Sequence, residues 1–270
     1  MPDIFQDIDS LDATARQRVI DRLEFRGSYA PFVAMRDSYL DALHLPPGAR
    51  ACELGCGTGV VSRAIAARES FDGTVIGTDL SEALVAEAER RSRAQGLDNA
   101  SFRSDPGGMS GEPDDSCDLV IVHTLISHVV ETAPLLAEAA RISNRNAKIV
   151  VFDGDYASLV CHAGNPPEDV AVVEAMLQAV VANPHVMRDF PRLMAEAGLS
   201  LISARSDVLL EVGSAEFFET MVETYVPMAV RAGLLDEGAA DEWLARFRSV
   251  CNAHQFFGSC NFVTYVSKPN

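Results

Sequence analysis

The sequence has few basic residues for its size. Its 270 residues carry 22 Lys and Arg against 39 Asp and Glu, a formal net charge of −17. Binding a polyanion requires clustered Lys and Arg to neutralise phosphates, and this chain offers no such cluster. We therefore expect no nucleic-acid partner.

Two further absences bear on where the protein works. The six cysteines form no C-x-x-C pair and fall mostly in apolar segments, so we expect neither a disulfide framework nor a thiolate metal site. No apolar run approaches the roughly 18 residues of a membrane span, and the chain does not open on a basic stretch leading into an apolar one. We expect a cytoplasmic protein without a membrane partner. The oligomeric state stays open, with a homodimer as one option.

The apolar residues follow a helical period first and a strand period later. Residues 12–45 hold two helical patterns, the second of which places Phe32, Met35 and Tyr39 on one face. From Arg50 onward, short apolar runs alternate with helical patterns, which is typical of right-handed β-α-β units on a parallel sheet. Strands are predicted near 50–54, 74–79, 100–104, 117–123 and 147–153, and helices near 59–69, 81–95 and 131–143.

The second half of the chain departs from this alternation. It predicts helices at 170–182 and 187–197, a strand at 199–212, a helical pair at 214–251 and a last strand at 260–267. The fold class is therefore α/β, with a mostly parallel sheet and helices on both faces. We divide the chain into an N-terminal helical flap (1–48), an α/β core (49–213), a helical cap (214–254) and a terminal strand that returns to the core sheet (255–270).

The first helix of the predicted cap has its own local signals. Ser214 is expected to cap it, and Pro227 is expected to kink or end it. Phe217, Met221 and Tyr225 lie on one broad apolar face. This face either closes over a ligand or packs into the core.

A glycine-rich loop follows the first predicted strand. Residues 51–60 read Ala-Cys-Glu-Leu-Gly-Cys-Gly-Thr-Gly-Val, so a strand runs through three alternating glycines into a helix. Glycine lets the backbone turn sharply and approach a ligand without a Cβ collision. The G-x-G-x-G spacing, with Val60 after Gly59, differs from the dinucleotide fingerprint G-x-G-x-x-G and argues against a nicotinamide dehydrogenase.

Acidic residues end the next two predicted strands. Asp79 lies 20 residues beyond Gly59, and Asp105 follows the third strand. A carboxylate at the first of these positions can accept hydrogen bonds from both hydroxyls of a ribose. The fourth strand ends at His123, at the same edge of the sheet.

These motifs together resemble those of class I S-adenosylmethionine-dependent methyltransferases, over about residues 30 to 155. The resemblance implies a Rossmann-like, seven-stranded sheet. It places the three glycines against the methionine and ribose parts of S-adenosylmethionine, Asp79 on the ribose, Asp105 near the adenine amino group, and the His123 and Thr124 backbone at the amino-acid portion. The full expected cofactor set is Tyr29, Glu53, Gly55, Cys56, Gly57, Thr58, Gly59, Asp79, Leu80, Asp105, Pro106, His123 and Thr124.

Methyl transfer from a sulfonium needs few catalytic residues, because the leaving group is already activated. The enzyme mainly holds the nucleophile in line and removes a proton. We predict His128 as the base, oriented by Asp153, with His123 as a second candidate. Alternatively, His128 only packs at a helix start and Asp153 only ends its strand. Asp153 and Asp155 are too few ligands for a metal site, so no metal is expected.

The predicted function is methylation of a small organic metabolite, with oxygen favoured over nitrogen or carbon as the acceptor, in secondary metabolism. The acidic surface, the apolar cap and the histidines motivate this choice. One alternative is a methyltransferase fold recruited to a methyl-independent reaction such as cyclisation or dehydration. Another is a noncatalytic subunit that binds the cofactor only to stabilise its fold.

Overall fold

The structure is a computed structural model, and it describes residues 8–105 and 108–270. Its seven strands form one sheet in the order β3-β2-β1-β4-β5-β7-β6. The strands are β1 (Arg50–Leu54), β2 (Thr74–Asp79), β3 (Ala100–Ser104), β4 (Cys117–His123), β5 (Ser143–His162), β6 (Leu199–Gly213) and β7 (Phe256–Pro269).

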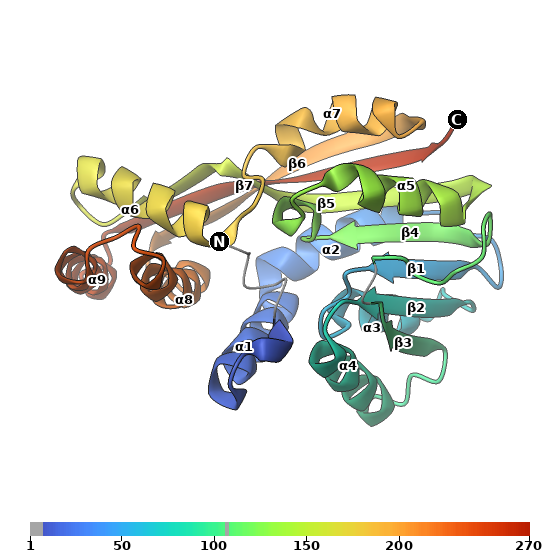
Figure 1. Ribbon diagram of the computed structural model, residues 1–270, viewed down its shortest axis with the longest axis horizontal. Helices are drawn as coiled ribbons and strands as arrows, with labels where there is room; N and C mark the ends of the chain where they lie inside the picture. The colour runs from blue at the N-terminus through green and yellow to red at the C-terminus, as the bar shows by residue number, and fades with distance from the viewer. Residues whose placement is uncertain (1–7, 106–107) are drawn as a thin grey trace.

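Helices cover both faces of this sheet (Figure 1). The α-helices in the described residues are α1 (Ala13–Ser28), α2 (Ala30–Ala42), α3 (Val60–Ala66), α4 (Glu82–Ala94), α5 (Thr132–Ile142), α6 (Pro166–Val180), α7 (Val186–Glu196), α8 (Phe217–Arg231) and α9 (Glu237–Asn252). Two short 3-10 helices, η2 (Ile8–Ser10) and η3 (Ile126–His128), precede α1 and α5. No α-helix within the described ranges is both long enough and apolar enough to cross a bilayer.

The sheet is mostly parallel, as predicted. Strand β7 pairs antiparallel with both of its neighbours, β5 and β6, whereas the pairs from β3 to β5 are parallel. The carboxyl ends of β1, β2 and β4 therefore meet at one edge, where open α/β sheets bind ligands. The predicted α/β fold class is confirmed.

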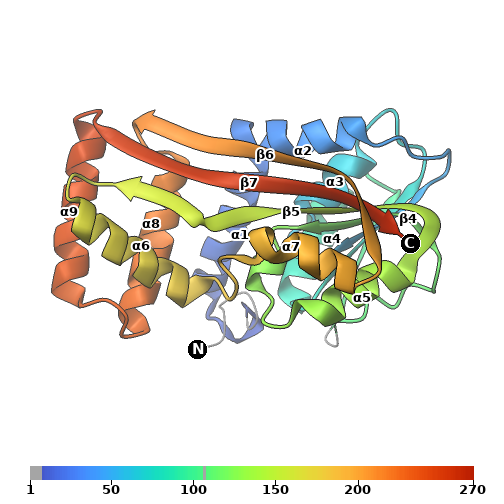
Figure 2. The ribbon, with the colours of Figure 1, turned by 90° about the horizontal axis from the view of Figure 1, so that it is seen from above.

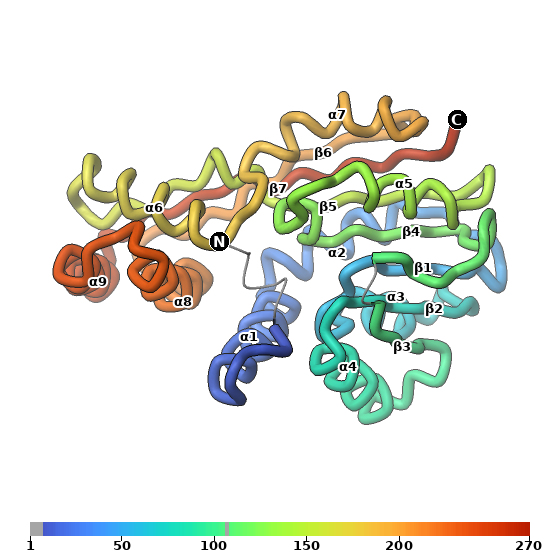
Figure 3. The backbone as a smooth tube through the Cα atoms, in the orientation of Figure 1, coloured from blue at the N-terminus to red at the C-terminus, as the bar shows by residue number. Residues whose placement is uncertain are grey.

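Strand β5 is longer than the predicted strand at 147–153. It continues from Ser143 to His162, and beyond Phe152 it pairs only with β7 because β4 has ended at His123. The pairing is irregular between Asp155 and Val160. Residues 153–155 read Asp-Gly-Asp, and both residue types are depleted in strands, so the local sequence does not predict this extension. Strands β5, β7 and β6 consequently run side by side along the molecule (Figures 2 and 3).

Two apolar clusters hold the helices to the sheet. The larger contains buried side chains of α2, α3, α6, α8 and α9, and the smaller contains those of α5 and α7. In Figure 1, α5 and α7 lie above the sheet, whereas α8 and α9 lie below it. Burial of this apolar area is the main stabilising term of the fold.

One local prediction about the cap, the capping of its first helix, is wrong. Helix α8 begins at Phe217, and its start is capped by the Glu211 side chain, which accepts hydrogen bonds from the backbone nitrogens of Glu216 (3.0 Å), Phe217 (2.8 Å) and Phe218 (3.1 Å). Ser214 therefore does not act as the cap. The helix continues through Pro227 to Arg231. Packing of its apolar face in the larger cluster outweighs the local signal of the proline.

Candidate cofactor and active site

The three glycines after β1 adopt a conformation that other residues rarely adopt. Their φ angles are +67° at Gly55, +53° at Gly57 and +74° at Gly59. Space is equally restrictive, since a Cβ on Gly55 would lie 2.6 Å from the Leu125 side chain and one on Gly59 would lie 2.5 Å from the Phe102 ring. The turn thus presents bare backbone at the edge where the parallel strands end.

A pocket of about 120 Å³ lies against this turn. Its walls come from α1, from the glycine turn, and from the segments that follow β2 and β4. The predicted site residues that line it are Glu53, Gly55, Cys56, Gly57, Thr58, Asp79, Leu80, His123, Thr124 and His128. The structure therefore brings most of the predicted cofactor set together with the predicted base.

Asp79 ends β2 beside the glycine turn. Its carboxylate accepts hydrogen bonds from the backbone nitrogens of Gly57 (2.7 Å) and Ser81 (3.0 Å). Burial raises the pKa of Asp79 from its usual value, although both hydrogen bonds act against this shift. A carboxylate has about four lone-pair sites. It can therefore also accept hydrogen bonds from a vicinal diol in the pocket.

Glu53 lies beneath the turn and ties β1 to the start of α3. Its Oε2 accepts hydrogen bonds from the backbone nitrogen (2.8 Å) and the hydroxyl (2.5 Å) of Ser62. Burial raises the pKa of Glu53 to about 7, against the effect of these hydrogen bonds. Half of its acceptor capacity faces Ser62, so its first role is to support the turn from below.

Two neighbours of the glycines have different surroundings. The Thr58 side chain is buried at 1% exposure, and its Oγ1 has no hydrogen-bond partner among the described residues. Buried hydroxyls normally have a partner, so this one suits a polar atom of a bound ligand. Cys56 instead packs in a small apolar cluster with Val85, Ala88 and Phe102, and burial raises its pKa well above the usual value.

Strand β4 delivers His123 and Thr124 to the other side of the pocket. The His123 Nδ1 lies 3.0 Å from the Tyr39 hydroxyl, and its ring stacks on Phe152 with centroids 4.5 Å apart. Burial, followed by the charges of Arg26 and Arg36, lowers the pKa of His123 well below its usual value. The ring is therefore neutral at pH 7.

His128 and Asp153 meet around η3, where the charge of His128 acts on the Asp153 carboxyl. The His128 Nδ1 lies 3.1 Å from the Val180 carbonyl oxygen. Asp153, fully buried, accepts hydrogen bonds from the backbone nitrogens of Ser127 (3.0 Å) and Gly154 (2.7 Å). Burial raises the pKa of Asp153, and the charge of His128 opposes this shift. Asp153 thus fixes the segment that carries His128.

Other predicted cofactor residues do not line the pocket. The Tyr29 hydroxyl donates to Glu211 Oε1 at 2.6 Å, and Gly59 faces Phe102. Asp105 lies just after β3, where its backbone nitrogen donates to the Asp79 carbonyl at 2.8 Å. Pro106 lies outside the described residues.

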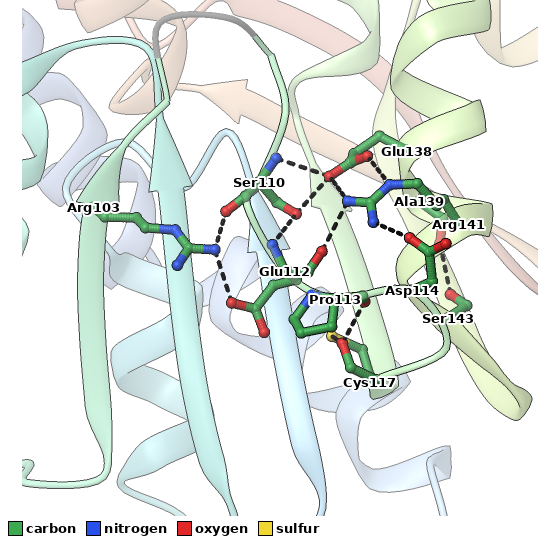
Figure 4. A network of polar contacts seen from close by, with 11 residues as sticks. Arg103, Ser110, Glu112, Pro113, Asp114, Cys117, Glu138, Ala139, Arg141 and Ser143 are labelled. Atoms are coloured by element: carbon green, nitrogen blue, oxygen red, sulfur yellow. Dashed lines mark hydrogen bonds and ion pairs between the residues drawn. The ribbon is translucent and has the colours of Figure 1, made fainter.

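A polar network joins Arg103 of β3, residues 110–114 and α5 (Figure 4). Glu112 accepts from Arg103 (2.8 Å), and Glu138 of α5 accepts from the Ser110 hydroxyl (2.6 Å) and from Arg141 (2.8 Å). Both carboxylate side chains are 1% exposed, so they need these partners. The network anchors the chain that leaves the Asp79 side of the pocket.

Helix α1 contributes side chains to the pocket that were not predicted from the sequence. Leu23, Arg26 and Gly27 of this helix line the pocket. A Cβ on Gly27 would lie 2.3 Å from Val60, so α1 packs closely on the start of α3. A glycine within a predicted helix often marks such a close approach, so Gly27 could have indicated that this helix packs against the glycine turn.

The sheet order and a glycine turn facing an acid define a Rossmann-like protein of the nucleotide-binding kind. A family model described as a methyltransferase domain matches residues 45–224. The chain therefore belongs to the methyltransferase domain family. Proteins of this family use S-adenosylmethionine as the methyl donor.

Two curated proteins are similar to this chain in sequence. The chain is 28% identical over 209 residues to an uncharacterised 37.1 kDa protein in transposon Tn4556 of Streptomyces fradiae, covering 76% of this chain and 59% of that protein. It is 28% identical over 201 residues to nocamycin O-methyltransferase of Saccharothrix syringae, covering 72% of this chain and 67% of that protein.

Two solved structures share the fold. Phosphoethanolamine N-methyltransferase 2 of Haemonchus contortus, in complex with S-adenosyl-L-methionine, has a TM-score of 0.60 and 18% identity, covering 100% of this chain and 61% of that one. The [4+2]-cyclase SpnF has a TM-score of 0.55 and 14% identity, covering 88% of this chain and 81% of that one.

Proposed function

We propose that this protein transfers the methyl group of S-adenosylmethionine to an oxygen atom of a small organic molecule. The observation that carries the proposal is that the glycine turn, Asp79 and His128 all line the same pocket. The name of the nocamycin relative supports oxygen as the acceptor.

The residues around the pocket suit the cofactor. Asp79 would accept hydrogen bonds from the ribose hydroxyls. The backbone of Gly55 and Gly57 would lie against the sugar and the amino acid of the cofactor. The Thr58 hydroxyl would form a hydrogen bond with a polar group of the cofactor. Bound S-adenosylmethionine supplies an electrophilic methyl group on a positively charged sulfur. Two observations support this fit. The buried Thr58 hydroxyl has no hydrogen-bond partner among the described residues, and Gly55 and Gly57 have no Cβ that would fill space beside the turn.

His128 is the stronger candidate for the base. Its Nδ1 lies 3.1 Å from a carbonyl oxygen, which can only accept a hydrogen bond, so Nδ1 carries a proton, and His128 lines the same pocket as the glycine turn. His123 is less suited because its low pKa makes it a weak base and its Nδ1 is engaged by Tyr39. In this proposal His128 accepts the hydroxyl proton of the acceptor, and Asp153 holds η3 in place.

Two variants test the proposal by calorimetry and by release of S-adenosylhomocysteine. We expect Asp79→Ala to weaken S-adenosylhomocysteine binding about 10- to 100-fold, because hydrogen bonds to a charged group are lost. His128→Ala should retain this affinity and lose turnover by about 100-fold or more. Exposed Asp98 and His44 provide matched alanine controls. Unchanged affinity in Asp79→Ala would contradict the cofactor assignment.

A methyl-independent reaction is the second candidate, and the structural similarity to a cyclase favours keeping it. A methyltransferase releases one S-adenosylhomocysteine for each product molecule. A cyclase or dehydratase would form product while the cofactor remains unchanged. A noncatalytic subunit would bind the cofactor and form no product without a partner protein.

A further inference from the structure

Strand β6 forms one edge of the sheet and lacks most of the features that usually protect an edge. Figure 2 shows it as the outermost of the three long strands, and in the described part of the chain it pairs on one side, with β7. The other side of this 15-residue strand therefore presents a row of backbone N–H and C=O groups. The strand contains no proline, and residues 201–206 are all exposed. Its pairing with β7 is irregular at one place, between Leu201 and Ser203.

One face of β6 is apolar and only partly covered. Val208, Leu210 and Val212 alternate along the strand, and each is more than half exposed. Phe257 of β7 lies opposite Val212 and extends the same face. At the other end of the strand this face is covered, because Leu199 packs in the apolar cluster of α7. An exposed apolar patch of this kind marks an interaction surface.

The charges at the centre of β6 are self-complementary in one register. Arg205 and Asp207 lie on the same face, on either side of Ser206, and the Arg205 Nε donates to Asp207 Oδ1 at 2.9 Å. In an antiparallel pair of strands, opposite charges that face each other stabilise the pair and like charges destabilise it. A two-fold axis through Ser206 places Arg205 of each copy opposite Asp207 of the other copy. An axis through position 205 or 207 would instead place two like charges opposite each other.

We propose that the occupant of this edge is a second copy of the chain. The two β6 strands pair antiparallel about a two-fold axis at Ser206, so that one sheet continues through both copies. Ala204 of each copy then lies opposite Val208 of the other, and α7 of each copy lies beside the uncovered apolar end of the other strand. With a net charge of −17, two copies repel each other over most of their surface. The β6 edge lets them meet through uncharged side chains and two opposite-charge pairs.

Sedimentation velocity of the full chain tests the dimer, which should have the mass of two chains at micromolar concentration. Arg205→Asp and Asp207→Arg each turn both opposite-charge pairs into like-charge pairs, so each should weaken the dimer about 10- to 100-fold. Arg93 and Glu89 form an exposed ion pair on α4. Arg93→Asp and Glu89→Arg are therefore charge-matched controls, and both should remain dimeric.

Mixing the two single variants separates pairing between copies from the ion pair within one chain. In the mixed dimer every position 205 lies opposite a position 207 of the other sign, although neither chain regains its internal pair. The mixture should therefore form a dimer again. The double variant Arg205→Asp/Asp207→Arg should dimerise with itself but not with the parent protein, and it carries the test if a single variant does not fold.

Three results would overturn the proposal. A monomeric parent protein would show that a second copy does not occupy the β6 edge, and a peptide that adds a strand there would then be the alternative. A dimer that persists in both single variants would have its interface elsewhere. Single variants that dissociate and stay monomeric when mixed would show that the two charges act only within one chain.

Discussion

Gly59 occupies a position where one added carbon atom would meet two neighbours. Its φ is +74°, and a Cβ there would lie 2.5 Å from the Phe102 ring and 3.0 Å from the Ala88 Cβ. We expect Gly59→Ala to lower the free energy of unfolding by about 2–4 kcal/mol, from backbone strain and overpacking together. Gly96 has a similar φ of +69° with open space around it, so Gly96→Ala should cost only about 1 kcal/mol. Urea unfolding measures both, and equal losses would contradict the steric argument.

Glu53 should make stability depend on pH in a defined direction. Its pKa in the folded protein is raised to about 7 from 4.5, so the folded state binds this proton more tightly than the unfolded chain does. Its contribution to stability is therefore greatest at low pH and is lost as the pH rises through this window. Glu53→Gln removes the titration, so the unfolding free energy of the variant relative to the parent should rise between pH 5 and pH 8, by roughly 3 kcal/mol.

Denaturant unfolding at several pH values gives this difference directly. Exposed Glu69 provides the control Glu69→Gln, whose difference from the parent should stay flat. A Glu53→Gln difference that is equally flat would show that the carboxyl titrates normally.

The sequence could predict the residues of the site that act through backbone geometry. Gly55, Gly57 and Asp79 follow short apolar strands whose ends meet by the rules of parallel sheets, so order and spacing were sufficient. Arg26 could not be predicted in this way, because its contact with Thr124 joins residues 98 positions apart in sequence. Only packing of α1 on the sheet edge brings the two together.

The start of α8 depends on a single side chain from β6. Glu211, 7% exposed, accepts three backbone hydrogen bonds and one from the Tyr29 hydroxyl. Burial and the neighbouring Glu211 raise the pKa of Tyr29. We expect Glu211→Ala to cost about 2–3 kcal/mol of stability, because buried donors lose their acceptor, and Tyr29→Phe about 1 kcal/mol. Exposed Glu216 gives the control Glu216→Ala. Thermal unfolding checks the order, and a loss as large in the control would contradict it.

The secondary structure was predictable where local pattern and tertiary contacts agree. Strands β1 to β4 match their predicted bounds, since each is a short segment between turn residues at the spacing of β-α-β units. The end of β5 and the cap of α8 were not predictable. The extension of β5 to His162 is held by pairing with β7, about 100 residues later in the chain, and α8 is capped from outside its own sequence.

The pocket is too small for the ligand that its residues suit. Its volume is about 120 Å³, whereas ligand pockets usually measure about 300–1,000 Å³. Ile8, 2% exposed, lines the pocket and packs with Val19, Ile20 and Leu84. We therefore expect the segment from Ile8 through α1 to move when a nucleoside enters. Its attachment to α4 should then set the rate of exchange.

Asp9 makes this attachment at the start of α4. Its carboxylate accepts hydrogen bonds from the Ser81 hydroxyl (2.7 Å) and from the backbone nitrogens of Glu82 (2.9 Å) and Ala83 (3.2 Å). Removing such a cap costs about 1 kcal/mol, which corresponds to about a fivefold change in the population of the open form. We expect Asp9→Ala to speed both association and dissociation of S-adenosylhomocysteine about fivefold in stopped-flow fluorescence.

The affinity should change much less than the rates, because opening accelerates entry and exit together. Asp21 lies on α1 and bonds only to Gln17 within the described residues, so Asp21→Ala should leave both rates unaltered. Dissociation that is equally fast in the parent protein and in Asp9→Ala would mean that the nucleoside enters without release of Asp9 from α4. In that case the pocket must widen by movement of the segments after β2 and β4 instead.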